Sequence, residues 1–329
     1  FVASAPDIGM YPGEKVRLNY DVEPWYVAEK YEFEHSSNDT NIAQVNEKGE
    51  VTALKEGSAI ITIKPKNSYI QASVTIRVKN EFVIENRELV AYKGLGGNVV
   101  IPDDEGILYI GAFAFCLYET DNSVELEEDD YDSNKIPASN TSVTSVVIPK
   151  GVEEIKKYAF YNCTGLKSVT IPDSVKFIRE FAFYGDKKLK TVNVVKEDGT
   201  MVEGNDLTQS KVEVIGASAF KNCKALANIN LASVLSIGAN AFEYCTSLAS
   251  ANLTALRNTG KEAFKDCTSL TSVVLDKSTQ LSYAMFAKSG LTSVDIYNQR
   301  TFIPEYCFAR CDNLESVTIH NDSLAIGNG

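Results

Sequence analysis

The stretch Asn240-Ala-Phe-Glu-Tyr-Cys-Thr-Ser-Leu248 returns one period later as Glu262-Ala-Phe-Lys-Asp-Cys-Thr-Ser-Leu270. In both copies a Cys follows the Phe by three positions, and a Leu follows the Cys by three. Five Phe residues of this kind stand 22 positions apart: Phe220, Phe242, Phe264, Phe286 and Phe308. A constant period of roughly 20–29 residues with recurrent Leu, Ile and Val is typical of leucine-rich solenoids. The sequence therefore predicts a solenoid.

Each unit continues with a Leu-x-x-Val-x-Ile pattern, as in Leu166, Val169 and Ile171. Apolar residues two positions apart indicate a short strand with one face inward. We expect the Ala to be small where the backbone turns and the Phe to fill the coil interior. Because one coil cannot bury its own apolar edge, the coils must stack and pair their strands. The predicted ladder has about nine parallel strands, from Val99–Ile101 to Val317–Ile319.

The chain has seven cysteines, and five of them fall at the same repeat position: Cys163, Cys223, Cys245, Cys267 and Cys311. A position between two core anchors predicts a buried, reduced thiol. Cys307 and Cys311 are close in sequence, so a disulfide or a metal pair remains an alternative there. Each occupies a repeat position, however, which favours two core thiols.

Two insertions interrupt the period, one near 119–140 and one near 196–210. The first holds eight Asp and Glu residues between Glu119 and Asp132 without a basic residue among them, which predicts a solvated loop. Asp130 and Asp132 resemble the start of an EF-hand loop, but Lys135 stands where that loop needs Gly. We therefore expect an acidic loop rather than a calcium site. The second insertion carries turn signals around Gly199 and Gly204.

Residues 1–80 do not share the period. They contain short alternating segments such as 59–63 and 72–78, separated by turn residues such as Pro12-Gly13. Closely spaced alternating strands indicate a small β-sandwich. The predicted organisation is mixed, with an all-β sandwich at 1–80 and the solenoid at 81–329.

The first segment resembles the bacterial group 2 immunoglobulin-like domain. The similarity rests on residues 36–63, where Gly49-x-Val-Thr-Ala-Leu-x-x-Gly57 matches the core spacing of that family. The Trp that usually precedes the Ser36-Ser37 segment is absent, and Phe33 lies near its place. The resemblance implies an immunoglobulin-like (Ig-like) fold.

From Phe82 onward the chain resembles the BspA-like, Treponema-type leucine-rich repeat proteins. The similarity rests on Ile171-Pro-Asp-Ser-Val-Lys-Phe-Ile178 and on the repeated Ala-Phe-x-x-Cys. Asp186 and Ser289 depart from the pattern at the Cys position. The resemblance implies a surface-exposed or secreted bacterial protein, since some members are adhesins for host proteins or other bacteria. It implies no catalytic residues.

Composition excludes several classes of function. A net charge of −12 over 329 residues argues against a duplex-binding surface, so we expect no nucleic-acid partner. No apolar run approaches the ~20 residues of a membrane span. No signal peptide is visible, although a processed N-terminus would look the same, and the chain stops within a repeat, as expected of part of a longer polypeptide.

The sequence contains few residues in patterns that could support catalysis. The two histidines, His35 and His320, lie in different predicted domains. The His-Glu-x-x-His zinc motif, the Gly-x-Ser-x-Gly elbow and a Gly-rich phosphate loop are all missing from the sequence. We therefore predict no enzyme activity, no cofactor and no metal site.

The surface of the strand ladder is the remaining candidate for function. Residues between the apolar anchors should face outward, and they are small, polar and nearly uncharged. The predicted partner-binding residues are Ser168, Thr170, Thr191, Asn193, Asn228, Asn230, Ser250, Asn252, Ser272, Ser293, Asp295, Ser316 and Thr318. The alternative is that short residues merely fit a crowded ladder.

These observations predict a non-enzymatic protein, extracellular or at the cell surface, that uses the solenoid for adhesion or protein binding. The expected partner is a host or bacterial surface protein. A carbohydrate or cell-wall binding module is the first alternative, and scarce aromatic residues on the strand columns speak against it. A spacer for another domain is the second.

Overall fold

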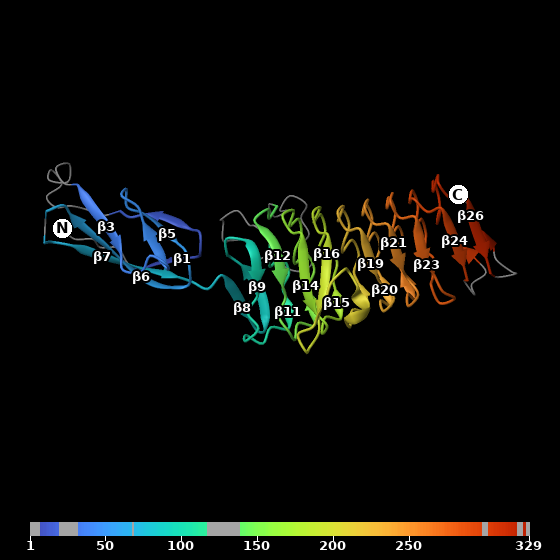
Figure 1. The fold of residues 1–329 in the computed structure, drawn as a ribbon, viewed down its shortest axis with the longest axis horizontal. Coiled ribbons are helices and arrows are strands. Elements are labelled where there is room, and N and C mark those ends of the chain that lie inside the picture. Colours follow the sequence, from blue (N-terminus) through green and yellow to red (C-terminus); the bar gives the residue numbers. More distant parts are fainter. Residues whose placement is uncertain are drawn as a thin grey trace. The chain divides into compact units, whose positions relative to one another are not determined.

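The computed structural model describes residues 7–19, 32–67, 69–116, 139–297, 302–320 and 325–326. Most of the predicted acidic insertion, including Asp130 and Asp132, lies outside these residues. The chain divides into two compact units (Figure 1). The first comprises Phe1–Val83 with Tyr92–Leu95, and the second comprises Ile84–Ala91 with Gly96–Gly329.

The N-terminal unit consists of two sheets around one hydrophobic core. The larger sheet has the order β1 (Ile8–Met10), β7 (Ala72–Val78), β6 (Gly57–Pro65) and β3 (Phe33–Ser37). The smaller has the order β2 (Lys15–Arg17), β5 (Glu50–Ala53) and β4 (Ala43–Val45). Alternate residues of β6, such as Ile61 and Ile63, are fully buried and meet Val51 of β5 in the core. The period-2 pattern of the sequence thus forms a sandwich, as predicted.

The second unit is an all-β solenoid of parallel strands, which confirms the predicted fold class. Nine strands in its described part, divided among three sheets, make up what we call the wide ladder: β10 (Gly97–Val100), β12 (Val143–Val147), β14 (Ser168–Pro172), β16 (Thr191–Val195), β19 (Asn228–Asn230), β21 (Ser250–Asn252), β23 (Ser272–Val274), β24 (Ser293–Ile296) and β26 (Ser316–Ile319). The inward anchors of its central strands, such as Val169 and Ile171, are fully buried.

A second set of shorter strands forms what we call the narrow ladder. Its eight-stranded sheet consists of β8 (Phe82–Glu85), β9 (Glu88–Tyr92), β11 (Tyr109–Ile110), β13 (Glu154–Ile155), β15 (Phe177–Ile178), β18 (Val214–Ile215), β20 (Ser236–Ile237) and β22 (Asn258–Thr259). β25 (Phe302–Ile303) and β27 (Ala325–Ile326) form a further pair of the same kind. Most of the two-residue strands carry one fully or nearly buried anchor, such as Ile155 or Ile237, whereas β22 has none.

The coils turn through Ala-Phe between the two ladders. In the coil of Phe242, the flanking Asn240 and Tyr244 have φ values of 60° and 62°, and Ala241 between them is fully buried. The left-handed conformation on both sides brings the backbone round tightly, so that only a small side chain fits inside. The Phe rings stack from Phe115 to Phe308 with centroids 4.6–5.7 Å apart. Both roles predicted for Ala and Phe are confirmed.

All seven cysteines are free and buried, which confirms the predicted reduced thiols. Each in-register thiol donates a hydrogen bond to the carbonyl oxygen of the Phe one coil earlier in the stack. Cys245 Sγ lies 3.1 Å from the oxygen of Phe220, and Cys267 Sγ lies 3.1 Å from that of Phe242. The thiol therefore satisfies a buried carbonyl group in addition to filling space.

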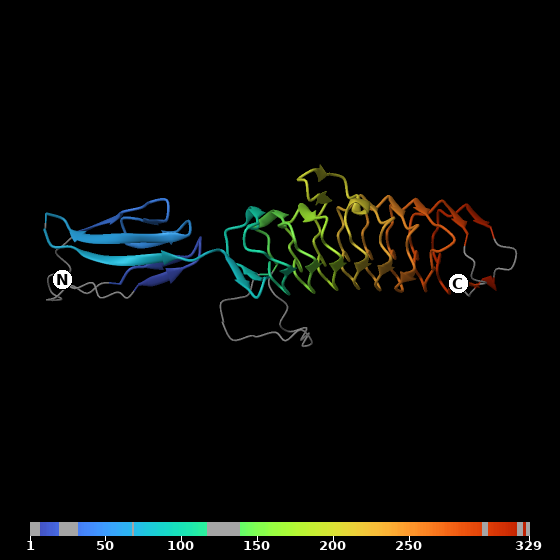
Figure 2. The same ribbon diagram turned by 90° about the horizontal axis from the view of Figure 1, so that it is seen from below.

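The second insertion forms a β-hairpin and an extra rung. β17 (Met201–Val202) pairs antiparallel with β16, and the hairpin stands out from the solenoid wall in Figure 2. The chain then returns between β16 and β19, where the Asn230 N–H donates to the Asn205 carbonyl oxygen at 2.9 Å. The 3₁₀ helix Leu207–Gln209 follows, with Leu207 fully buried. On the narrow ladder β15 and β18 pair directly, so the rung widens one side only.

Candidate binding surface

The predicted contact residues lie in two columns along the wide ladder. Parallel pairing aligns them from coil to coil, with the partners Ser168↔Thr191, Thr170↔Asn193, Asn228↔Ser250, Asn230↔Asn252, Ser250↔Ser272, Ser293↔Ser316 and Asp295↔Thr318. The ladder therefore presents them on one face of the solenoid. We call this surface the strand face.

Accessibility varies along the strand face. The first column is exposed from the central coils onward, at Asn228, Ser250, Ser272, Ser293 and Ser316. Further upstream, Thr170 lies between Val147 and Asn193 in the ladder and is only 6% exposed. The expectation that its side chain faces a partner is therefore wrong, and the most exposed residues of the first column are downstream of the extra rung.

Hydrogen bonds within the surface occupy some of its amides and leave its serines open. The Asn205 Nδ2 group donates to Asn228 Oδ1 at 2.9 Å, and Asn252 Oδ1 accepts from the Thr254 hydroxyl at 3.1 Å. Within the described part of the chain, the hydroxyls of Ser250 and Ser272 have no side-chain partner. These two serines are therefore the groups most available to a ligand.

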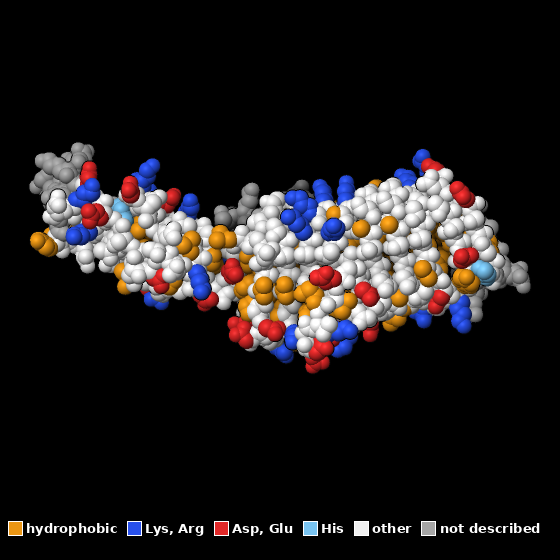
Figure 3. Space-filling model, viewed as in Figure 1, with side chains coloured by type: hydrophobic (Ala, Val, Ile, Leu, Met, Phe, Trp, Pro, Cys, Tyr) orange, Lys and Arg blue, Asp and Glu red, His pale blue; other side chains and the backbone are white. Residues whose placement is uncertain are grey.

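The strand face carries little charge. Among the predicted residues only Asp295 is ionisable, and its carboxylate lies 3.4 Å from Nε2 of His320. The His320 ring stacks on Tyr297 at 4.2 Å with an interplanar angle of 3°. Figure 3 shows charged side chains gathered mainly along the edges of the solenoid. A neutral surface that carries hydrogen-bonding groups can dock without a large desolvation cost.

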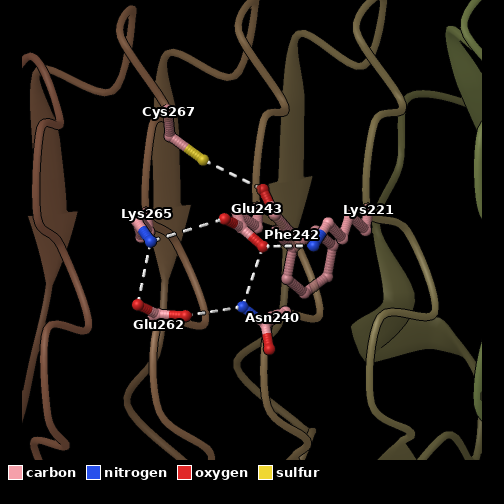
Figure 4. A network of polar contacts seen from close by, with 7 residues as sticks. All are labelled: Lys221, Asn240, Phe242, Glu243, Glu262, Lys265 and Cys267. Atoms are coloured by element: carbon pink, nitrogen blue, oxygen red, sulfur yellow. Dashed lines mark hydrogen bonds and ion pairs between the residues drawn. The ribbon is translucent and has the colours of Figure 1, made fainter.

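A charged network lies on the side of the coils that carries the Ala-Phe turns, which we call the turn side (Figure 4). The side chain of Glu243 is 4% exposed, and its carboxylate accepts from Lys221 Nζ at 2.6 Å and from Asn240 Nδ2 at 2.8 Å. Lys265 Nζ lies 3.7 Å away, and its hydrogen bond to Glu262 raises the pKa of the lysine. The alternation of Lys221, Glu243 and Lys265 one position after successive Phe residues was the sequence signal for this network.

The two histidines lie in different units of the chain. His35 lies in β3 of the N-terminal unit, where burial lowers its pKa, whereas His320 follows β26 in the solenoid. Burial raises the pKa of the Cys223 and Cys267 thiols well above the ordinary value, so they are poor nucleophiles. Within the described ranges, no group of three His, Cys, Asp or Glu residues could hold a metal ion. The same residues contain no helix long and apolar enough to cross a bilayer.

The sequence profile described as "BspA type Leucine rich repeat region" matches residues 135–204 and 205–315 in six copies. A comparison with curated proteins found no significant match.

Solved structures of similar fold include a leucine-rich repeat protein from Bacteroides ovatus, 24% identical with a TM-score of 0.50. That alignment covers 76% of this chain and 67% of the other. A leucine-rich repeat protein of T. pallidum is 21% identical over 73% of this chain and 77% of its own, with a TM-score of 0.40. A leucine-rich cell surface protein from Faecalibacterium prausnitzii is 17% identical over 75% and 96%, with a TM-score of 0.35. The Bacteroides structure supports the solenoid fold.

Proposed function

The chain belongs to the BspA-type leucine-rich repeat family, and from this premise we propose a non-enzymatic bacterial protein, secreted or held at the cell surface, that binds another protein. The strand face is the docking surface, and its partner is an extended segment of a host or bacterial surface protein. The observation that carries the proposal is the pair of exposed, uncharged hydroxyl groups at Ser250 and Ser272, aligned by the register of the wide ladder, with the exposed Ser293 in the next coil.

Hydroxyl and amide side chains both donate and accept hydrogen bonds, so they can satisfy the polar groups of an extended chain. The coil repeat of the ladder offers these groups at regular intervals, which suits a partner that lies along the solenoid rather than in a deep pocket. The N-terminal unit is in this proposal a bacterial group 2 Ig-like domain. Its support is the Gly49 to Gly57 spacing together with two sheets around one core.

The test is the double substitution Ser250→Arg with Ser272→Arg. These residues are paired neighbours on exposed strands and touch no core anchor, so the protein should fold normally. Bulk and charge at this place should weaken binding at least tenfold, which is about 1.4 kcal/mol. Arrays of purified extracellular-matrix and bacterial surface proteins identify the partner, and surface plasmon resonance measures the affinity.

The matched control is Ser236→Arg with Asn258→Arg. This pair is also aligned in adjacent coils, but it lies in β20 and β22 of the narrow ladder. We expect the control to retain the affinity of the native chain. If the control loses binding while the strand-face variant binds fully, the partner docks on the narrow ladder and the proposal is wrong.

A further inference from the structure

One turn of the solenoid, between the Phe and the following Leu, is a residue shorter than the same turn in the neighbouring coils, although the period stays at 22 residues. Phe264 and Leu270 are six positions apart, as are Phe308 and Leu314, but Phe286 and Leu291 are separated by only five. The shortened turn contains Gly290, whose backbone packs closely against the preceding coil. A Cβ at this position would lie 2.3 Å from the carbonyl oxygen of Thr268, so only glycine fits.

Beside the shortened turn lies a hollow of about 450 Å³, on the edge between the turn side and the strand face. The turn with Thr268 forms one wall, and the turn with Asp312 and Asn313 forms the other. Its floor is Gly290 with the buried Ser289, whose hydroxyl lies 3.3 Å from the thiol of Cys311. We call this hollow the Gly290 notch. Its volume is near the lower end of the roughly 300–1,000 Å³ usual for small-molecule sites.

Three charged side chains from successive coils line the Gly290 notch. Asp266, Lys288 and Arg310 stand at the same repeat position, two residues after the Phe. The closest approach between Lys288 and Asp266 is 3.8 Å, too long for a good hydrogen bond, and the second carboxylate oxygen of Asp266 is buried without a partner. The guanidinium of Arg310 is exposed and has no partner among the described residues. The donors of Arg310 in the notch are thus left unused.

We propose that the Gly290 notch binds a carboxylated sugar residue. The planar guanidinium of Arg310 suits a carboxylate, and Lys288 adds a second positive charge beside it. Oδ1 of the partly exposed Asp266 and the exposed Asp312 accept hydrogen bonds from sugar hydroxyls, and Thr268 and Asn313 can donate or accept. A multiply charged phosphate fits less well, because the two carboxylates repel it. The site is separate from the docking surface proposed above and does not depend on it.

The experiment titrates the full chain with glucuronic acid and follows the protein by NMR. Parallel titrations use glucose, which lacks the carboxylate, and inorganic phosphate, which lacks the hydroxyls. The expected result is saturable binding of glucuronic acid that is at least tenfold tighter than binding of either control. No saturation, or equal affinity for glucose, would overturn the proposal. Equal or tighter binding of phosphate would show that the notch binds anions without recognising the sugar, and would also overturn the proposal.

Two variants locate the interaction. Arg310→Ala removes an exposed side chain that has no partner among the described residues, so folding should be preserved and glucuronic acid should bind at least tenfold more weakly. Lys224→Ala removes an exposed cation from a turn of normal length, directly after Cys223 in another coil, and should leave the affinity unchanged. An Arg310→Ala protein that binds as well as the native chain would contradict the assignment.

Discussion

At the scale of single residues, Asp186 differs most from its equivalents in other coils. It occupies the position of Cys163 and Cys223, it is fully buried, and neither of its carboxyl oxygens has a partner in the described structure. Burial raises the pKa of Asp186 well above its ordinary value. A protonated carboxyl group carries an O–H that can donate as the thiols of the other coils do. We therefore expect Asp186 to be a neutral acid in the folded protein.

This protonation makes stability depend on pH. Below an ordinary Asp pKa of 3.8 both states hold the proton and there is no penalty. As pH rises further, the unfolded chain releases the proton while the folded chain retains it. The free energy of unfolding should therefore fall by about 1.4 kcal/mol per pH unit until the raised folded pKa is reached. Asp186→Cys removes this loss, so its stability gain over the native chain should grow as the pH rises above about 4 in urea unfolding.

Ser289→Cys is the matched control, because it introduces the same thiol at the other departure from the repeat without removing an acid. Its effect on stability should be constant over the same pH range. The groups that face Asp186 are the thiols of Cys116, Cys163 and Cys223, whose pKa values are also raised, so they stay neutral there. A gain for Asp186→Cys that does not change with pH would show that Asp186 is not protonated in the folded state.

Among the structural elements, the extra rung after β17 is hydrogen-bonded into the wide ladder. The Asn205 side chain accepts from the Val192 N–H and donates to the Lys190 carbonyl and to Asn228. Asn205→Ala would leave buried backbone groups unsatisfied, and we expect a loss of about 2–3 kcal/mol in urea unfolding. Glu203→Ala in the exposed hairpin should change stability by less than about 0.5 kcal/mol. Equal small effects for both would mean that the insertion is dispensable.

The stacked Phe residues are the second element-scale feature. Phe242 is fully buried between Phe220 and Phe264, with ring centroids 5.3 and 5.2 Å away. Phe242→Ala should lower the free energy of unfolding by about 3–5 kcal/mol because it empties a core site. Since each coil contacts only its neighbours, calorimetry should show a broadened or split solenoid transition. A shift below about 1 kcal/mol would contradict this packing.

At the scale of the whole molecule, the repeat could be predicted because the same packing problem recurs in every coil. Ala241 and Phe242 have equivalents wherever the backbone turns, so sequence alone located the turns and the two strand columns. Features that occur only once in the chain have no repeated sequence pattern from which they could be predicted. The rung at Asn205 depends on side-chain bonds to strands that are distant in sequence, and the burial of Thr170 depends on its neighbours in the ladder. The sequence therefore predicts the residues of the two columns, but not which of these residues are exposed.

If the strand face meets the partner, site-specific photocrosslinking should capture that contact. A photoreactive phenylalanine analogue replaces Ser272 on the strand face in one protein and Asn258 on the narrow ladder in another. With the partner identified on the array, illumination should crosslink it to the position 272 protein and leave the position 258 protein free. Crosslinking at position 258 with none at position 272 would contradict the account.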